Sequence, residues 1–369
     1  MNRLFRWDQM GLFLLALAAG ILPFAVPEVC AAALREGLTL CSGPLLLSLF
    51  PFLVVSRLLI QCPESDLLAL PFRLAAWGIG IRTPCAARVL CIGFLGGFAP
   101  AASAAAQAVR TGQLTTEEAD ALLPACICSG PSFVVLTVGQ SLLGSAELGV
   151  LLFAAQITAN YLTAALLNRF AGVRSVKPGS AAPASPAPPR LDEILADAAI
   201  TYCKLCGFIL FFRMLAAGAG ALLPAGAGTL CSVLLEVCSG CDLASRTGRW
   251  GSLLCCAALS VQGLSVLLQV RTICPPEMTL RPLYWARMLH LPLSLALFYL
   301  LLPGGEVDVF STLPARVLLM RRVPPDCALL VFAVCCMAAC TLRSGIRQVE
   351  QKQMARNAGG CCINSKTLL

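Results

Sequence analysis

One acidic residue stands inside a long apolar stretch of the sequence. Glu236 lies between Leu235 and Val237, and a carboxylate in a membrane-type segment is costly unless it has a partner or a function. It could accept a coupling proton, pair with an arginine or bind a cation. It could equally cap or brace the chain break at Ser239 and Gly240, and both roles remain open at the level of the sequence.

Two Ser-Gly pairs interrupt apolar stretches in which a helix would otherwise continue. They are Ser129-Gly130, with Ser132 close behind, and Ser239-Gly240. A half-helix that begins after such a break points unpaired N–H groups and a partial positive charge into the protein. We therefore expect these residues to bind an anionic solute.

Two further sets of polar residues could line the same site. Gln262, Ser265 and Gln269 recur at helical spacing on roughly one face, which suits a polar lining or hydrogen bonds between helices. Arg57 and Arg213 could pair with the carboxylates of a solute. Alternatively, both arginines could extend from the ends of their spans to the membrane interface.

Enzyme chemistry finds little support in the sequence. The single histidine, His290, is expected at the membrane interface, and the nucleophile-elbow, zinc-peptidase and phosphate-loop motifs are absent. Two CxxC pairs, Cys203 with Cys206 and Cys238 with Cys241, have zinc-ligand spacing. Because they lie in apolar sequence, we interpret these thiols as small hydrophobic residues. We expect no catalytic residue, no metal and no cofactor.

The composition is that of an all-α, polytopic helical membrane protein. Of the 369 residues, 58% are hydrophobic and 12% are charged, against about 45–50% and 25% in soluble domains. Length and apolar content allow about 8 to 10 spans with broken or re-entrant helices. The net charge of +8 arises from short basic patches between apolar runs, so it predicts orientation in a lipid bilayer and no nucleic-acid partner.

The apolar runs give the expected order of membrane segments. We expect an uncleaved span over 11–26, with a cleaved signal peptide as the alternative. The following segments are 37–60, 85–109, a helix over 119–127 that starts at the Thr115-Glu118 capping box, and 147–170, and then 221–237, 250–270, 283–302 and 327–342. Five crossings before the basic linker would place it outside, so we expect 85–109 to be re-entrant.

The linker divides the chain almost in half. The expected parts are a first membrane half (1–171), a Pro/Ala linker (172–190), a second membrane half (191–342) and a basic cytoplasmic tail (343–369). From Arg169 to Arg190 there are four basic residues and no acid, which predicts a cytoplasmic linker. Phe52, Arg57 and Leu59 match Phe208, Arg213 and Leu215 at a constant offset. Each half then has two interrupted apolar segments and a regular span, an order that predicts two repeated halves around a transport site.

Several motifs in this order resemble the sporulation integral membrane protein YlbJ family, which belongs with the nucleoside-recognition or gate-domain membrane proteins. They are LFPFLVVSRLL over 49–59, the Gly-rich stretch 96–107 with the helix start that follows it, CSGPSFV over 128–134, LEVCSG over 235–240 and GLSVLLQV over 263–270. The resemblance covers most of the chain. One departure is the sequence GFAPAA over 97–102, which lacks the second glycine of the family's pattern.

The resemblance implies transport of dipicolinic acid from the mother cell toward the forespore during sporulation. It implies an integral protein of the mother-cell or outer forespore membrane of a spore-forming bacterium, with a homo-oligomer or other sporulation membrane proteins as partners. A structural or assembly protein needed for spore cortex formation is one alternative function. A nucleoside-type transporter is the other.

Overall fold

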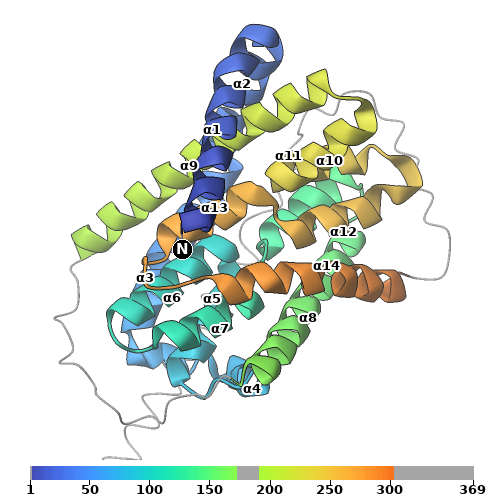
Figure 1. The fold of residues 1–369 in the computed structure, drawn as a ribbon. Coiled ribbons are helices and arrows are strands. Elements are labelled where there is room, and N and C mark those ends of the chain that lie inside the picture. Colours follow the sequence, from blue (N-terminus) through green and yellow to red (C-terminus); the bar gives the residue numbers. More distant parts are fainter. Residues whose placement is uncertain (1, 173–190, 303–369) are drawn as a thin grey trace, which may run out of the picture. The chain divides into compact units, whose positions relative to one another are not determined.

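The computed structural model describes residues 2–172 and 191–302, which are all-helical (Figure 1). The first sequence half contains α1 (Asn2–Ala25), α2 (Pro27–Ser42), α3 (Pro44–Gln61), η1 (Pro63–Asp66), α4 (Leu70–Gly78), α5 (Pro84–Gly96), α6 (Phe98–Arg110), α7 (Thr116–Cys126), η2 (Ser132–Leu142) and α8 (Ala146–Ala171). The second contains α9 (Leu191–Leu222), α10 (Ala225–Leu235), α11 (Val237–Ser245), η3 (Gly248–Trp250), α12 (Gly251–Val261), α13 (Gly263–Ile273) and α14 (Arg281–Leu301). The described residues belong to one compact unit.

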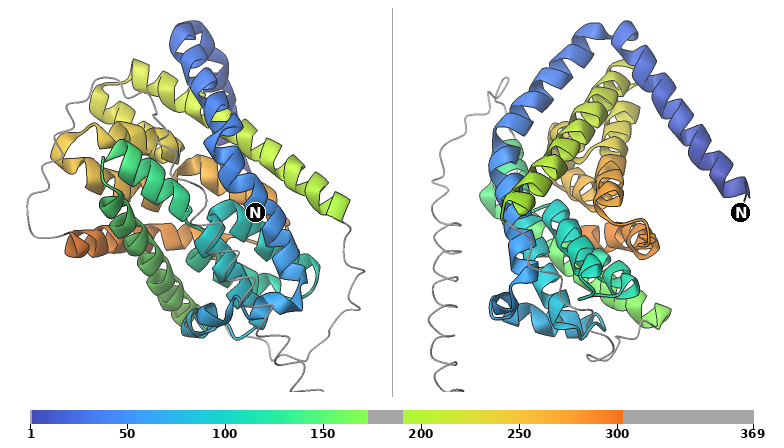
Figure 2. Two further views of the ribbon diagram at one scale, coloured as in Figure 1. Left: turned by 180° about the vertical axis from the view of Figure 1, so that it is seen from behind. Right: turned by 90° about the vertical axis from the view of Figure 1, so that its left-hand side faces the viewer.

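Three helical segments in the described ranges are long and apolar enough to cross a membrane. They are α8, α9 and the segment Gly248–Ile273. The stretches Phe13–Ala25 and Pro27–Ser42 pass the same test together, although they meet at 110° (Figure 2, right). These helices are compatible with a membrane protein. The larger number of spans stays a prediction, and the segment 327–342 lies outside the described residues.

Several expected segments differ from the observed helices. The predicted span 37–60 is divided between α2 and α3 at Gly43 and Pro44, where its sequence predicts an interruption, whereas the interruption predicted at Pro51 is absent because Pro51 lies inside α3. The predicted span 221–237 is wrong, because α9 extends to Leu222 and α10 ends before Glu236, whose backbone is extended. By contrast, the capping box of Thr115 and Glu118 is present, and α8 and α14 match their predicted ranges within two residues. Proline and interrupting polar residues thus divided runs that apolar content alone joins.

Four chain breaks meet as two pairs. The first pair joins the α5–α6 break at Gly97 (φ +82°) to the segment before η2, since a Cβ on Gly97 would lie 2.7 Å from the Gly130 nitrogen. In the second pair, a Cβ on Gly263 (φ +70°), at the α12–α13 break, would lie 2.9 Å from the Leu235 carbonyl carbon. Both contacts join backbone to backbone, so these glycines allow the broken helices to approach closely.

The long helix α9 packs against α2 and α3 through two ion pairs that join distant parts of the sequence. Near the start of α9, Asp197 binds Arg57 of α3 at 2.6 Å. Further along α9, Arg213 binds Glu36 of α2 at 2.7 Å. The later residue of α9 therefore meets the earlier helix, so α9 runs opposite to the α2–α3 segment. Arg57 and Arg213, which match in the sequence repeat, each pair with an acid of the other sequence half.

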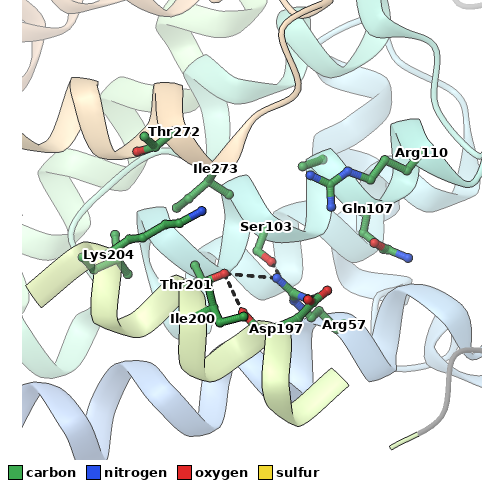
Figure 3. Close-up of a pocket in the computed structure, with 12 residues that line it drawn as sticks. Arg57, Ser103, Gln107, Arg110, Asp197, Ile200, Thr201, Lys204, Thr272 and Ile273 are labelled. Atoms are coloured by element: carbon green, nitrogen blue, oxygen red, sulfur yellow. Dashed lines mark hydrogen bonds and ion pairs between the residues drawn. The ribbon is translucent and has the colours of Figure 1, made fainter. Parts of the chain in front are cut away.

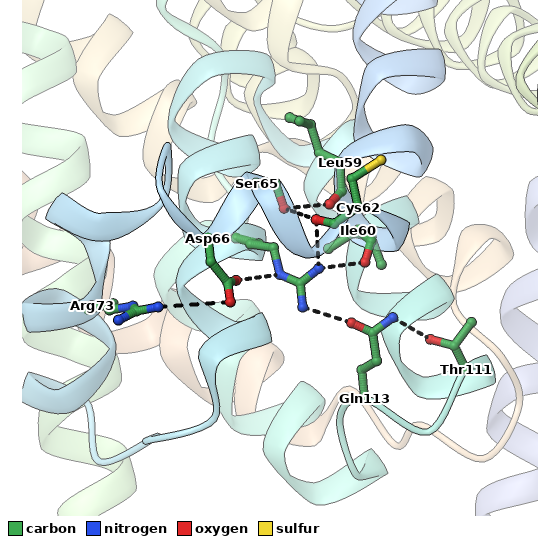
Figure 4. A network of polar contacts seen from close by, with 9 residues as sticks. Leu59, Ile60, Cys62, Ser65, Asp66, Arg73, Thr111 and Gln113 are labelled. Carbon is green, nitrogen blue, oxygen red and sulfur yellow. Dashed lines mark hydrogen bonds and ion pairs between the residues drawn. The ribbon is translucent and has the colours of Figure 1, made fainter. Parts of the chain in front are cut away.

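A polar network around Arg88 of α5 fastens the turn after α3 (Figure 4). Arg88 is largely buried, and its guanidinium lies 3.1 Å from Asp66 of η1. The same group donates to the Ile60 carbonyl at 2.6 Å and to the Gln113 side chain at 2.9 Å. One buried cation thus joins the end of α3, η1 and the turn after α6.

Replacement of Arg88 with methionine is expected to lower the unfolding free energy by about 2 kcal/mol, because the Ile60 carbonyl and Asp66 lose their donor. The measurement is the thermal unfolding midpoint of the detergent-purified protein. Arg73→Met is the control, since Arg73 contacts the same Asp66 at 3.8 Å from a more exposed position. Equal midpoints for the two variants would contradict the assignment.

Candidate functional site

A basic pocket of about 140 Å³ lies between helices of both sequence halves (Figure 3). Its charged lining residues are Arg57, Arg110 and Lys204 against one acid, Asp197. Helices α3 and α6 supply one wall, and α9 and the end of α13 supply the other. The pocket therefore carries an excess of positive charge, which suits an anion.

Arg57 is anchored in the wall of the basic pocket. Besides Asp197, its guanidinium donates to Thr201 Oγ1 at 3.2 Å and to Ser103 Oγ at 3.4 Å. The residue is only 9% exposed, so its guanidinium is held among α3, α6 and α9. These contacts hold the charge at the edge of the cavity.

The other two cations of the basic pocket are less constrained. Arg110, at the end of α6, and Lys204, in α9, are exposed and have no hydrogen bond or ion pair with the described residues. Figure 3 shows the two side chains extending toward each other across the pocket. Both charges are therefore available to a ligand.

A second cavity, here called the break cavity, has a volume of about 60 Å³ and lies where the chain breaks converge. Five predicted site residues line it: Ser129, Gly130, Ser132, Glu236 and Gln269. The remaining lining comes from α3, α9 and both sides of the α5–α6 break, with Phe133, Val237, Cys238 and Val266. Residues far apart in the sequence are thus brought together much as the interrupted segments predicted.

Glu236 caps α11 from the wall of the break cavity. The residue is 2% exposed, and its carboxylate accepts hydrogen bonds from the Cys238 nitrogen at 2.9 Å and the Ser239 nitrogen at 2.7 Å. The start of α11 is therefore occupied by an internal carboxylate. This arrangement corrects the expectation that the break at Ser239 and Gly240 offers free N–H groups to an anionic solute.

Gln269 brings an unused acceptor to the break cavity. Its Nε2 donates to Ser265 Oγ at 2.8 Å, while its Oε1 is buried without a hydrogen-bond partner. Ser265 thus supports Gln269 without lining the cavity itself. Gln269 therefore lines the cavity as expected, whereas its bond to Ser265 lies within α13 and is not the bond between helices that was the alternative.

The remaining predicted site residues lie outside both cavities. Arg213 pairs with Glu36, and Gln262 donates to the Ile127 carbonyl at 3.3 Å. A Cβ on Gly240 would lie 2.8 Å from the Val233 Cα, so this glycine permits close packing of α11 on α10. Ser239 contributes its backbone nitrogen to Glu236. These residues shape the surroundings of the cavities.

The two cavities lie along the same four helices. From the break cavity toward the basic pocket, α3 presents Leu49 and then Arg57, α6 presents Phe98 and then Ser103, α9 presents Ile209 and then Thr201, and α13 presents Gln269 and then Thr272. Leu53 and Tyr202 stand between these positions on α3 and α9, and they belong to a hydrophobic cluster with Ala99, Ala198 and Leu205. The arrangement is a charged pocket and a mainly apolar cavity with a few polar groups, with this apolar cluster at helix positions between them.

Arg287 of α14 is an important residue that sequence reasoning missed. It is 7% exposed and donates to the Ile127 carbonyl at 2.7 Å and the Ser260 carbonyl at 3.4 Å. A cation is thus bound where α7 and α12 end, which matches the negative ends of two half-helices. The spacing of Arg287, His290 and Ser294 on one helix face was the available signal.

The position predicted for His290 also differs from the structure. It is 1% exposed, and its Nε2 lies 3.2 Å from the Gln156 carbonyl oxygen, so the expected interfacial position is wrong. Asp120 of α7 was also missed: its carboxylate accepts from the Thr279 nitrogen at 2.9 Å and the Leu280 nitrogen at 3.2 Å. These contacts fix the loop before α14 to α7.

The cysteines of the two CxxC pairs gather no metal-binding set. Within residues 2–172 and 191–302, no group of three or more His, Cys, Asp or Glu side chains has a geometry suited to a metal ion. Cys241 instead accepts at its backbone carbonyl from the Cys255 thiol, at 3.4 Å. This contact joins α11 to α12.

The described residues therefore define an all-helical protein with three candidate membrane spans and two cavities at the contact between its sequence halves. Comparison with protein-family models, curated proteins and solved structures finds no match to the chain. The site itself must support any functional conclusion.

Proposed function

We propose that the protein is a membrane transporter for a small anion. The observation that supports this most directly is the line of two cavities along α3, α6, α9 and α13, interrupted by the hydrophobic cluster around Leu53 and Tyr202. Broken helices from both sequence halves border this line, as in carriers that bind solutes between repeats. The apolar cluster would close the pathway in this conformation.

The basic pocket supports an anion as the solute. Three basic side chains face one acid there, whereas the charged side chain of the break cavity is the carboxylate of Glu236. An anion would therefore be captured in the basic pocket. The pocket lies along the first turns of α9, directly after the linker that the basic residues predict to be cytoplasmic.

The break cavity suits a polar step in the same pathway. Helices α10 and α12 end at Glu236 and Gln262, where backbone groups lack the partners that a continuing helix would supply. These helix ends lie near a cavity that also contains Ser129, Ser132 and the unused Gln269 acceptor. Irregular backbone at membrane depth is tolerated where it is packed in protein or faces a cavity. Changes at these breaks would let one half move against the other.

Dipicolinate, moved from mother cell toward forespore, is the solute we propose from the motif resemblance. Its two carboxylates match the excess of basic side chains in the pocket. The proposed location is the mother-cell or outer forespore membrane, in a chain organised as two gate-domain-like halves. An assembly role in cortex formation and nucleoside transport are the competing functions.

We expect the protein in liposomes to move labelled dipicolinate, and Arg57→Gln to reduce the initial rate at least about tenfold, because a charge-assisted contact is lost. Arg213→Gln is the matched control. It removes an arginine whose side chain is about as buried as that of Arg57. This arginine pairs with Glu36 and lines neither cavity. Its transport rate should stay within about twofold once protein amounts are equal.

Three results would overturn the proposal. A folded protein that moves no dipicolinate and binds no other small anion would favour an assembly role. Uptake of a labelled nucleoside without dipicolinate uptake would favour nucleoside transport. An equal loss of rate in the Arg57 and Arg213 variants would remove the basic pocket from the pathway.

A further inference from the structure

We propose that Asp197 is an internal competitor for the solute: a compact dianion binds the basic pocket by taking the place of the Asp197 carboxylate on Arg57, while Arg110 and Lys204 hold its second anionic group. This inference rests on the proposed function and concerns the same pocket. It names the chemical class of the ligand and the residues that select it.

Asp197 has the geometry of an exchangeable partner. Its carboxylate lies 2.6 Å from Arg57, yet its side chain is 61% exposed while that of Arg57 is 11% exposed. Arg57 keeps contacts with Thr201 and Ser103 that do not involve this carboxylate. Asp197 can therefore turn into solvent without leaving the arginine without partners, and an incoming carboxylate can occupy its position.

The second group of the ligand would meet two charges that have no partner among the described residues. Arg110 and Lys204 face the pocket from α6 and α9 and form no hydrogen bond or ion pair with residues of the described ranges. Exchange at Arg57 leaves its charge balance unchanged, since one carboxylate replaces another. Binding of a second anionic group adds two new ionic contacts, so a dianion gains what a monoanion does not.

The size and the lining of the pocket restrict the ligand further. A volume of about 140 Å³ lies below the roughly 300–1,000 Å³ of sites for drug-sized ligands. Gln107 and Thr272 supply additional polar groups at the rim. The ligand class is therefore a short dicarboxylate or a comparable compact dianion.

Exchange would also alter the contact between the two halves. The Arg57–Asp197 pair joins α3 to α9, and a bound anion would replace it with contacts to α3, α6 and α9 together. The ion pair thus holds the empty protein together at the point where solute enters. Its replacement gives the solute a means to favour another arrangement of α9.

The test compares dipicolinate with picolinate, which lacks one carboxylate, by calorimetric titration of the detergent-purified full chain at low salt. Wild type should bind dipicolinate at least about tenfold more tightly. Asp197→Asn should bind both compounds about three- to tenfold more tightly than wild type, because the competitor has lost its charge. The double variant Arg110→Gln with Lys204→Gln should bind the two compounds about equally.

The matched control is Asp242→Asn. Asp242 forms an ion pair of similar length with Arg246, at 2.7 Å, away from both cavities, so its loss should leave both affinities unchanged. Unchanged or weaker dipicolinate binding by Asp197→Asn, at an unchanged unfolding midpoint, would overturn the inference. If wild type transports dipicolinate, that outcome leaves the proposed function standing; if wild type binds neither compound, both proposals fail.

Discussion

Gly97→Ala is expected to prevent accumulation of folded protein. Gly97 has φ +82° and ψ −163°, a region of backbone conformation that only glycine adopts readily. A Cβ there would lie 2.7 Å from the Gly130 nitrogen and 3.0 Å from its Cα. Because both neighbours are backbone atoms, no side chain can rotate away. Strain and overpacking together should cost at least about 4 kcal/mol.

The measurement for Gly97 is the yield of monodisperse protein in detergent and its unfolding midpoint. Gly207→Ala is the control, because a Cβ at Gly207 of α9 has no atom within 4 Å and alanine favours a helix by up to about 1 kcal/mol. The control should match or exceed wild type. A Gly97 variant with a wild-type midpoint would show that the two breaks do not meet as described.

Arg287→Leu should produce the second large loss. The leucine fills much of the same space, but the Ile127 and Ser260 carbonyls lose their shared donor. Both carbonyls stand at the ends of half-helices, where the helix itself supplies no partner. We expect a loss of about 3 kcal/mol, because two buried carbonyl acceptors lose hydrogen bonds from a charged donor.

The Arg287 experiment needs variants that separate charge from volume. Arg287→Lys retains the charge and one donor group, so it should recover part of the lost midpoint. Arg246→Leu removes an exposed arginine that pairs within its own helix and should change stability by less than about 0.5 kcal/mol. Equal effects of the leucine variants at 287 and 246 would refute the role of Arg287.

Local structure was predictable where its causes lie within a few residues. The Thr115-Glu118 capping box, the 147–170 helix and the interruption near Gly97 all depend on neighbours in the chain. The extent of α9 was less predictable because apolar content continues past its end. Glu236 was identified as unusual from its apolar neighbours alone, but its role as the cap of α11 required the backbone geometry.

Some of the predicted site residues lie together in the structure. Ser129, Ser132, Glu236 and Gln269 share one cavity, because interrupted helices place their polar residues at the same depth. Arg213, which matched Arg57 in the repeat, lies outside both cavities, since its partner Glu36 belongs to a helix that does not reach the basic pocket. Equivalent positions in the sequence repeat therefore did not place both arginines at a cavity.

The sequence by itself determined an all-helical chain with apolar helices, interrupted segments and a few polar residues in apolar surroundings, since composition and local spacing suffice for these features. Only the tertiary structure decided that Asp197 forms an ion pair with Arg57 and that Arg287 joins the ends of α7 and α12. It also decided that the basic pocket and the break cavity follow the same four helices. The physical reason is sequence distance. The Arg57–Asp197 and Arg287–Ile127 contacts each join residues more than a hundred positions apart, so they form only when whole helices pack together.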